Sequence, residues 1–222
     1  MTAQPPLDLS LYLVVDPRRC EGRALLALVE AAVAGGVTAV QLRDKQSSTR
    51  RLVHEARRLK AWLAGRAVPL LVNDRVDVAL AAEADGVHLG QDDMAPADAR
   101  RLLGPDAVIG LTVRSLAEAR AAPRDVVDYV SIGGVFATAS KDNPEPPCGL
   151  EGLRRIAAAL DLPRVAISGI DHGNAADVIR AGVDGVAVIS AICAAPDPRA
   201  ASAALAATVH GARHRRQRKV SA

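Results

Sequence analysis

The sequence predicts a single α/β domain with the (β/α)8 architecture of a TIM barrel, and three observations predict it. Short β-branched runs alternate with Ala-, Leu- and Arg-rich segments of helical period, which indicates parallel strands joined by helical crossovers. The strand-like runs are continuously apolar, as expected of strands that are covered on both faces. Eight such pairs fit a chain of 222 residues, because compact barrels of this type begin at about 200 residues.

The strand and helix pairs can be placed along the chain in order. Each strand is a short run of Val, Leu and Ile, and each helix is the segment of helical period that follows it. The pairs are 11–15 with 21–36, 38–42 with 48–65, 69–72 with 75–83, 86–89 with 95–104, 107–112 with 115–123, 129–133 with 149–161, 164–168 with 172–182, and 185–190 with 197–209. Glycine allows a helix to stop where the next strand begins, at Gly35, Gly36, Gly86, Gly182 and Gly185. These turns belong to the bottom of the barrel, so an active site is expected at the C-terminal ends of the strands.

Composition narrows the class of protein. The longest apolar stretches are too short to span a bilayer, and no charged segment leads into an apolar signal core, so a cytoplasmic protein without a membrane partner is expected. Cys20, Cys148 and Cys193 have no metal or redox spacing, which favours reduced thiols. Aromatic residues make up 2% of the chain, which leaves little surface for stacking bases and argues against nucleic-acid binding. We expect a monomer or a homodimer.

Basic residues are concentrated at the end of the chain. Five of them lie within the last ten residues, and without their charges the formal net charge of +3 becomes −2: Arg213, Arg215, Arg216, Arg218 and Lys219. A short basic end is usually solvated, and binding of a polyanion is the less favoured alternative. We therefore expect a catalytic barrel at residues 1–209 and a basic, disordered tail at residues 210–222.

Two carboxylates follow consecutive predicted strands. Asn73 and Asp74 end the run LLVND, and Asp93 follows the next run, GVHLGQDD. Neighbouring parallel strands lie about 4.8 Å apart, so two such carboxylates repel unless one is protonated or a cation lies between them. Oxygen ligands without a His or Cys cluster favour Mg²⁺, which binds carboxylates together with phosphate oxygens. The pair alone is equally compatible with Asn73 as a helix cap and Asp93 as a solvated loop acid.

Polar side chains also follow the other strands. Gln41, Arg43 and Lys45 alternate along one strand end, so they are expected to face the barrel mouth as a cationic clamp. The remaining candidates lie at the ends of four later strands: Thr112, Thr138, Ser140, Lys141, Gly169, Ile189 and Ser190. Glycine and helix N-termini after the last strands of such barrels often bind phosphate, so two anion sites are expected.

Each of these residues also has an ordinary structural explanation. Arg43 and Lys45 could be surface charges, and Ser190 could be a helix cap. Independent surface residues would not all fall at one end of the barrel, which favours a site. His88 lies within an apolar strand, where a hydrogen-bonded structural role is favoured over a catalytic one.

The chain resembles the thiamine-phosphate synthase family over residues 11–192. The matching segments are LYLVVDP, GGVTAVQLRDK, LVNDRVDVALAAEADGVHLGQDD, TASKD with the following PPCGLEGL, and GVDGVAVISAI. The resemblance implies a (β/α)8 barrel that uses one Mg²⁺ per site. It also implies transfer of the 4-amino-2-methylpyrimidine-5-methyl group from its diphosphate to the nitrogen of a thiazole phosphate or its carboxylate, with release of pyrophosphate.

The resemblance also implies a role for each candidate residue, from its position in the family's motifs. Asp74 and Asp93 match the family's Mg²⁺ ligands. The positions that match contacts to the pyrimidine diphosphate are Gln41, Arg43, Lys45, Asn73, Thr112 and Lys141, and those at the thiazole phosphate are Thr138, Ser140, Gly169, Ile189 and Ser190. Among them we expect Arg43, Lys45, Lys141 and Thr112 to act in catalysis, in a largely dissociative displacement.

The chain departs from the family pattern at four positions. Thr112 stands where Ser is usual and Ser140 where Thr is usual, while Gly134 and Ala137 replace common prolines. These changes affect pocket geometry more than activity. The alternatives are a related thiazole phosphate tautomerase, which would need a proton shuttle instead of a diphosphate clamp, and a non-catalytic regulator that binds thiamine phosphate.

Overall fold

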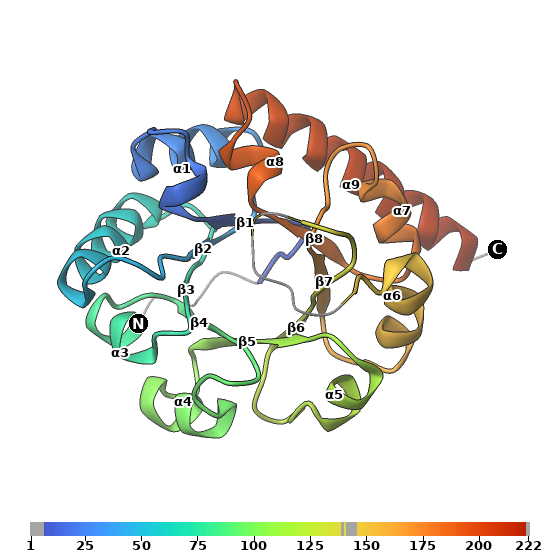
Figure 1. The fold of residues 1–222 in the computed structure, drawn as a ribbon, viewed down its shortest axis with the longest axis horizontal. Helices are drawn as coiled ribbons and strands as arrows, with labels where there is room; N and C mark the ends of the chain where they lie inside the picture. Colours follow the sequence, from blue (N-terminus) through green and yellow to red (C-terminus); the bar gives the residue numbers. More distant parts are fainter. Residues whose placement is uncertain (1–6, 139, 141–145, 221–222) are drawn as a thin grey trace.

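The strands close into one parallel barrel, as the sequence predicts. The computed structural model describes residues 7–138, 140 and 146–220. Within this part of the chain the strands lie in sequence order around the barrel, and β1 pairs with β8 to close it (Figure 1). Their bounds are β1 (Leu11–Val15), β2 (Ala39–Leu42), β3 (Leu70–Asn73), β4 (Gly86–Leu89), β5 (Val108–Val113), β6 (Tyr129–Ile132), β7 (Arg164–Ile167) and β8 (Gly185–Val188).

The helices form the outer ring of the barrel (Figure 1). Their bounds are α1 (Leu25–Ala34), α2 (Thr49–Leu63), α3 (Val76–Ala81), α4 (Pro96–Leu103), α5 (Leu116–Ala121), α6 (Gly149–Ala158), α7 (Ala175–Arg180), α8 (Ser190–Cys193) and α9 (Pro198–Val220), with a 3₁₀ turn, η1 (Pro17–Arg19). The sequence prediction missed the short helix α8. It extended the last strand to residue 190, whereas β8 ends at Val188 and Ser190 begins α8.

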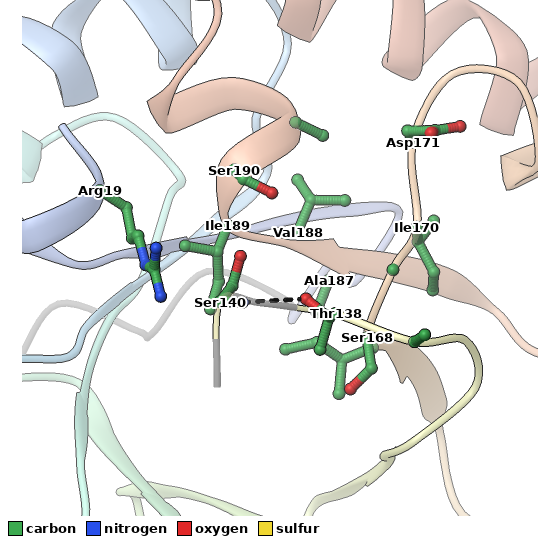
Figure 2. Close-up of a pocket in the computed structure, with 14 residues that line it drawn as sticks. Arg19, Thr138, Ser140, Ser168, Ile170, Asp171, Ala187, Val188, Ile189 and Ser190 are labelled. Carbon is green, nitrogen blue, oxygen red and sulfur yellow. Dashed lines mark hydrogen bonds between the residues drawn. The ribbon is translucent and has the colours of Figure 1, made fainter. Parts of the chain in front are cut away.

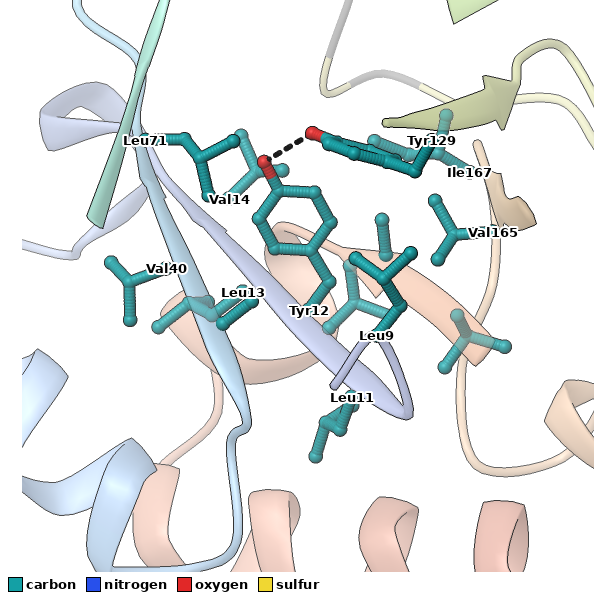
Figure 3. Packing of buried hydrophobic residues seen from close by; sticks show 14 of the residues in the cluster. Leu9, Leu11, Tyr12, Leu13, Val14, Val40, Leu71, Tyr129, Val165 and Ile167 are labelled. Carbon is teal, nitrogen blue, oxygen red and sulfur yellow. Dashed lines mark hydrogen bonds between the residues drawn. The ribbon is translucent and has the colours of Figure 1, made fainter. Parts of the chain in front are cut away.

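Side chains from the strands fill the barrel interior. Tyr12 and Tyr129 are the largest fully buried side chains, and Figure 3 shows them among apolar residues such as Leu9 and Val165. Full burial of one such aliphatic side chain contributes about 1.5–3 kcal/mol. At the bottom, a Cβ atom on Gly185 would lie 1.7 Å from the carbonyl oxygen of Leu9, so only glycine fits there. The packed interior fixes the loops that follow the strands.

The C-terminal residues correct the expected domain boundary. Residues 210–220 continue helix α9 instead of forming a disordered tail. Arg216 donates hydrogen bonds to the carbonyl oxygens of Ile179 (3.2 Å) and Val183 (2.5 Å) and pairs with Asp184 at 3.2 Å. Arg213 pairs with Asp8 at 3.7 Å. The charges alone predicted a solvated tail, whereas one face of the basic helix binds carbonyl and carboxylate groups of the barrel.

Replacing Arg216 by alanine is expected to lower the free energy of unfolding by about 1–3 kcal/mol, because the Val183 carbonyl oxygen loses a charged donor. Chemical denaturation of the purified protein measures this change. Arg215→Ala is the matched control, since Arg215 is exposed on the same helix, and it should stay within about 0.5 kcal/mol of wild type. Equal stability of the two variants would contradict a structural role for Arg216.

Two further expectations concern membranes and thiols. In the described part of the chain, no helix combines the length and apolar character needed to cross a membrane. Cys20, Cys148 and Cys193 are free thiols. The expectation of unpaired cysteines is therefore confirmed.

Candidate active site

Two cavities lie at the C-terminal ends of the strands, and nearly all the expected site residues line them. The first, of about 350 Å³, includes Arg43, Lys45, Asn73, Asp74, Asp93 and Thr112. The second, of about 490 Å³, includes Thr138, Ser140, Gly169, Ile189 and Ser190 (Figure 2). We call them the carboxylate cavity and the hydroxyl cavity. Lys141 lies outside the described residues.

Asp74 and Asp93 come together at the ends of β3 and β4. Asp74 has a left-handed backbone conformation (φ +63°), and its N–H donates to the His88 carbonyl oxygen at 2.8 Å. The Asp93 carboxylate accepts a 2.6 Å hydrogen bond from the Gly90 N–H. Burial raises the pKa of Asp93, and the neighbouring Asp74 carboxyl raises it further. The helix-cap explanation of Asn73 is wrong, because α3 begins at Val76 and the residue at its N-cap is Arg75.

The carboxylate pair has the chemistry of a hard-cation site. Lys45 lies 3.0 Å from Asp74 and supplies one positive charge. Among the described residues, no group of three or more His, Cys, Asp and Glu side chains could hold a metal. A cation bound here would therefore take two carboxylate ligands and complete its shell with water or phosphate oxygens. This donor set fits Mg²⁺.

Arg43 is fixed by a partner that the sequence analysis did not select. Asp16, which follows β1, accepts a 2.5 Å hydrogen bond from Arg43 Nη1, and both side chains are buried. Asp16 also pairs with Arg18 at 3.2 Å and accepts from the Arg18 N–H. Asp16 stands at a strand end, where the other candidates were sought, so the sequence did carry a signal for it. The buried pair orders the Arg43 guanidinium at the barrel mouth.

Gln41 lies deeper than the sequence analysis expected. It is 2% exposed and does not line either cavity. Its Nε2 donates to the Tyr12 hydroxyl at 2.7 Å. Alternation along β2 does point Gln41 and Arg43 to the same side, but Gln41 lies one layer below.

His88 is buried and hydrogen-bonded through both ring nitrogens, to Tyr129 and Thr112, which confirms that it is a hydrogen-bonded interior histidine.

The hydroxyl cavity is built from the loop after β6 and the ends of β7 and β8. The Ser140 N–H donates to Thr138 Oγ1 at 3.1 Å, so the Thr138 hydroxyl hydrogen can be donated elsewhere (Figure 2). Gly169 has φ +64°, and a Cβ atom there would lie 2.5 Å from the Ala137 carbonyl oxygen. Glycine is therefore required where the loops after β6 and β7 touch. Arg19 of η1 also lines this cavity, and the sequence analysis missed it.

A (β/α)8 barrel with a carboxylate pair and two cavities at its mouth has the arrangement of a barrel enzyme, whose active site lies at the C-terminal ends of the strands. Residues 11–192 match the family model of thiamine monophosphate synthase. The chain belongs to the thiamine monophosphate synthase family, and it is an enzyme of thiamine phosphate synthesis.

The relatives agree over nearly the whole chain. The thiamine-phosphate synthase of Xanthobacter autotrophicus is 54% identical over 94% of this chain and 99% of its own length. That of Chloroflexus aurantiacus is 50% identical over 91% and 94%. The solved thiamine phosphate pyrophosphorylase of Pyrococcus furiosus has a TM-score of 0.85 and 39% identity, covering 93% of this chain and 98% of that one. These matches favour the synthase over the tautomerase and the regulator.

Proposed function

We propose that the two cavities divide the substrates of thiamine phosphate synthesis between them. The carboxylate cavity takes the pyrimidine diphosphate with one Mg²⁺ on Asp74 and Asp93, and the hydroxyl cavity takes the thiazole phosphate. The observation that carries this proposal is that Asp74 and Asp93 line the same cavity, with Lys45 3.0 Å from Asp74. Two adjoining carboxylates next to a mobile ammonium fit a diphosphate bound through a divalent cation.

The residues of the carboxylate cavity would stabilise the departing pyrophosphate. When bound, Mg²⁺ supplies positive charge to the diphosphate oxygens. Arg43 is already ordered by Asp16, so little side-chain freedom is lost when it meets the diphosphate. Lys45 is about half exposed, so it can turn from Asp74 to the substrate. Fixed and mobile cations together stabilise charge that grows in the transition state.

No protein base is needed in this proposal. Loss of pyrophosphate leaves a cation on the pyrimidine methylene, which the amino-substituted ring delocalises. The pyrophosphate leaves with the electrons of the broken C–O bond, and the lone pair of the thiazole nitrogen then forms the new bond to that carbon. The barrel holds the two rings in line, and this positioning replaces acid–base catalysis. Thr112 lies at the edge of the carboxylate cavity, where it would contact the pyrimidine.

The proposed function is tested by measuring pyrophosphate release from both substrates, with and without Mg²⁺. Release is expected only when the pyrimidine diphosphate, the thiazole phosphate and Mg²⁺ are present together. A tautomerase would convert a thiazole phosphate alone, and a regulator would bind thiamine phosphate without turnover. Turnover that persists after complete removal of divalent cations would contradict the Mg²⁺ site.

Removal of the Thr138 hydroxyl is expected to weaken the binding of one substrate only. Thr138→Ala should raise the KM for the thiazole phosphate about tenfold, because one hydrogen bond to a charged group contributes about 1.5–3 kcal/mol. The KM for the pyrimidine diphosphate should stay within about twofold. Steady-state kinetics with each substrate varied in turn measures both values. The control is Thr208→Ala, which removes a hydroxyl that donates to the Ala204 carbonyl oxygen at a partly exposed position of α9. An equal rise in both KM values for Thr138→Ala would refute the assignment.

A further inference from the structure

A chain of buried hydrogen bonds crosses the barrel just below its mouth. Gln41 Nε2 lies 2.7 Å from the Tyr12 hydroxyl, which lies 2.9 Å from the Tyr129 hydroxyl. Tyr129 is in turn 2.7 Å from His88 Nδ1, and His88 Nε2 is 2.8 Å from Thr112 Oγ1. These residues come from β1, β2, β4, β5 and β6. The chain therefore joins Gln41 to Thr112, the two ends expected to meet the pyrimidine.

Packing holds the rings of this chain in place. The Tyr12 and Tyr129 rings meet edge to face with centroids 5.9 Å apart, and His88 lies 5.5 Å from the Tyr129 ring. Tyr129 also lies directly over Gly110, where a Cβ atom would be 2.1 Å from the ring. Figure 3 shows the two hydroxyl groups pointing toward each other within the apolar interior. The hydroxyls therefore have fixed positions and fixed partners.

The donors and acceptors run in one direction along the chain. Gln41 Nε2 donates to the Tyr12 hydroxyl. Either hydroxyl could donate in the Tyr12–Tyr129 bond, and the roles of the His88 nitrogens depend on its tautomer. The arrangement that gives every hydroxyl hydrogen an acceptor has Tyr12 donating to Tyr129 and Tyr129 donating to His88 Nδ1. His88 then carries its hydrogen on Nε2 and donates to Thr112 Oγ1. Burial raises the pKa of both phenols, which keeps them protonated and able to donate.

This direction fixes the atoms that the two ends can offer to a ligand. With Nε2 used by Tyr12, the Gln41 carboxamide has Oε1 left as an acceptor. With Oγ1 accepting from His88, the Thr112 hydroxyl has its hydrogen left to donate. One end therefore accepts and the other donates. A buried polar group that meets a ligand with the wrong polarity loses its hydrogen bond and strongly disfavours that ligand.

We propose that Tyr12, Tyr129 and His88 are positioning residues that set Gln41 as an acceptor and Thr112 as a donor, so that the site selects a pyrimidine with an amino group and an unprotonated ring nitrogen. The inference rests on the proposed function, which puts the pyrimidine against Thr112, and it adds that the ring reaches Gln41, one layer below Arg43. It extends that function by explaining the selectivity for the amino-pyrimidine through buried residues that do not touch it. His88 and the two tyrosines are expected to act through Gln41 and Thr112 and not on the reacting atoms.

The test compares the amino-pyrimidine diphosphate with its oxo analogue, in which an acceptor oxygen replaces the amino group and the adjacent nitrogen carries hydrogen. The ratio of their kcat/KM values is measured for wild type, Tyr12→Phe and Tyr129→Phe. Without the Tyr12 hydroxyl, the Gln41 carboxamide can rotate and present its N–H groups to the pyrimidine. The ratio is expected to fall at least tenfold in Tyr12→Phe, and at least as far in Tyr129→Phe, because loss of that hydroxyl frees His88 as well. The KM for the thiazole phosphate should not change.

Ser202→Ala is the matched control, because it removes a buried hydroxyl in α9 that donates to the Pro198 carbonyl oxygen. It should lower the thermal midpoint and leave the ratio unchanged. A ratio in both phenylalanine variants within twofold of wild type would overturn the proposal, whatever their stability. The ratio of the calorimetric affinities for the two pyrimidine diphosphates measures the same preference without turnover. A failure of the positioning chain is thus distinguished from a failure of the synthase activity.

Discussion

Asp93→Ala is expected to lower kcat/KM for the pyrimidine diphosphate by about 10³-fold at saturating thiazole phosphate. The change removes one of two carboxylate ligands, and loss of one group that stabilises transition-state charge costs about 10²–10³-fold in rate. The Mg²⁺ concentration needed for half-maximal activity should rise as well, because Asp74 would hold the ion alone. Steady-state kinetics across a Mg²⁺ titration measures both effects.

Asp92→Ala is the control for this experiment. Asp92 is exposed, precedes Asp93 in the same loop and also lines the carboxylate cavity, so the variant removes an equal charge from the cavity but leaves the Asp74–Asp93 pair intact. It should retain activity within about threefold of wild type. If Asp93→Ala kept its activity and its Mg²⁺ requirement, the carboxylate pair would not be the metal site, although the family assignment would be unaffected.

The fold could be predicted because its signals are local. Continuous apolar runs such as Leu11–Val15 and glycines such as Gly86 and Gly185 identify strands and turns from composition and spacing alone. The end of the chain could not be predicted in this way. Five basic residues look the same whether they are solvated or bound, and only the packed structure shows that Arg216 reaches the carbonyl oxygen of Val183.

The candidate site could be predicted in outline for the same reason. The strand-end rule applies to any parallel barrel, so the location of Asp74, Asp93 and Thr138 at the barrel mouth could be predicted without a structure. The partners of these residues depend on contacts between strands that are far apart in the sequence. The link from His88 to Tyr129 spans 41 residues, and no spacing rule connects them. Residues at strand ends are therefore easier to find in the sequence than the buried residues that position them.

Arg43→Gln is expected to have two effects that can be separated. Loss of a fixed cation from the carboxylate cavity should lower kcat about 10²–10³-fold. The same change takes away the closest partner of Asp16, which is fully buried and 2.5 Å from Arg43 Nη1. Arg18 remains 3.2 Å from Asp16 but is partly exposed, so the free energy of unfolding should fall by about 2–3 kcal/mol, somewhat less than for a fully unpaired buried charge.

The double variant Asp16→Asn/Arg43→Gln tells the two effects apart. Neutralising Asp16 removes the buried unpaired charge, so most of the lost stability should return in chemical denaturation, whereas kcat should stay low because no cation is restored. Asp16→Asn alone leaves Arg43 charged but less firmly held, and it should lose activity only about tenfold. If the double variant recovered kcat together with stability, Arg43 would contribute to activity only by stabilising the folded barrel. A stable double variant without activity would instead place the Arg43 charge on the diphosphate, with Asp16 as the residue that holds it there.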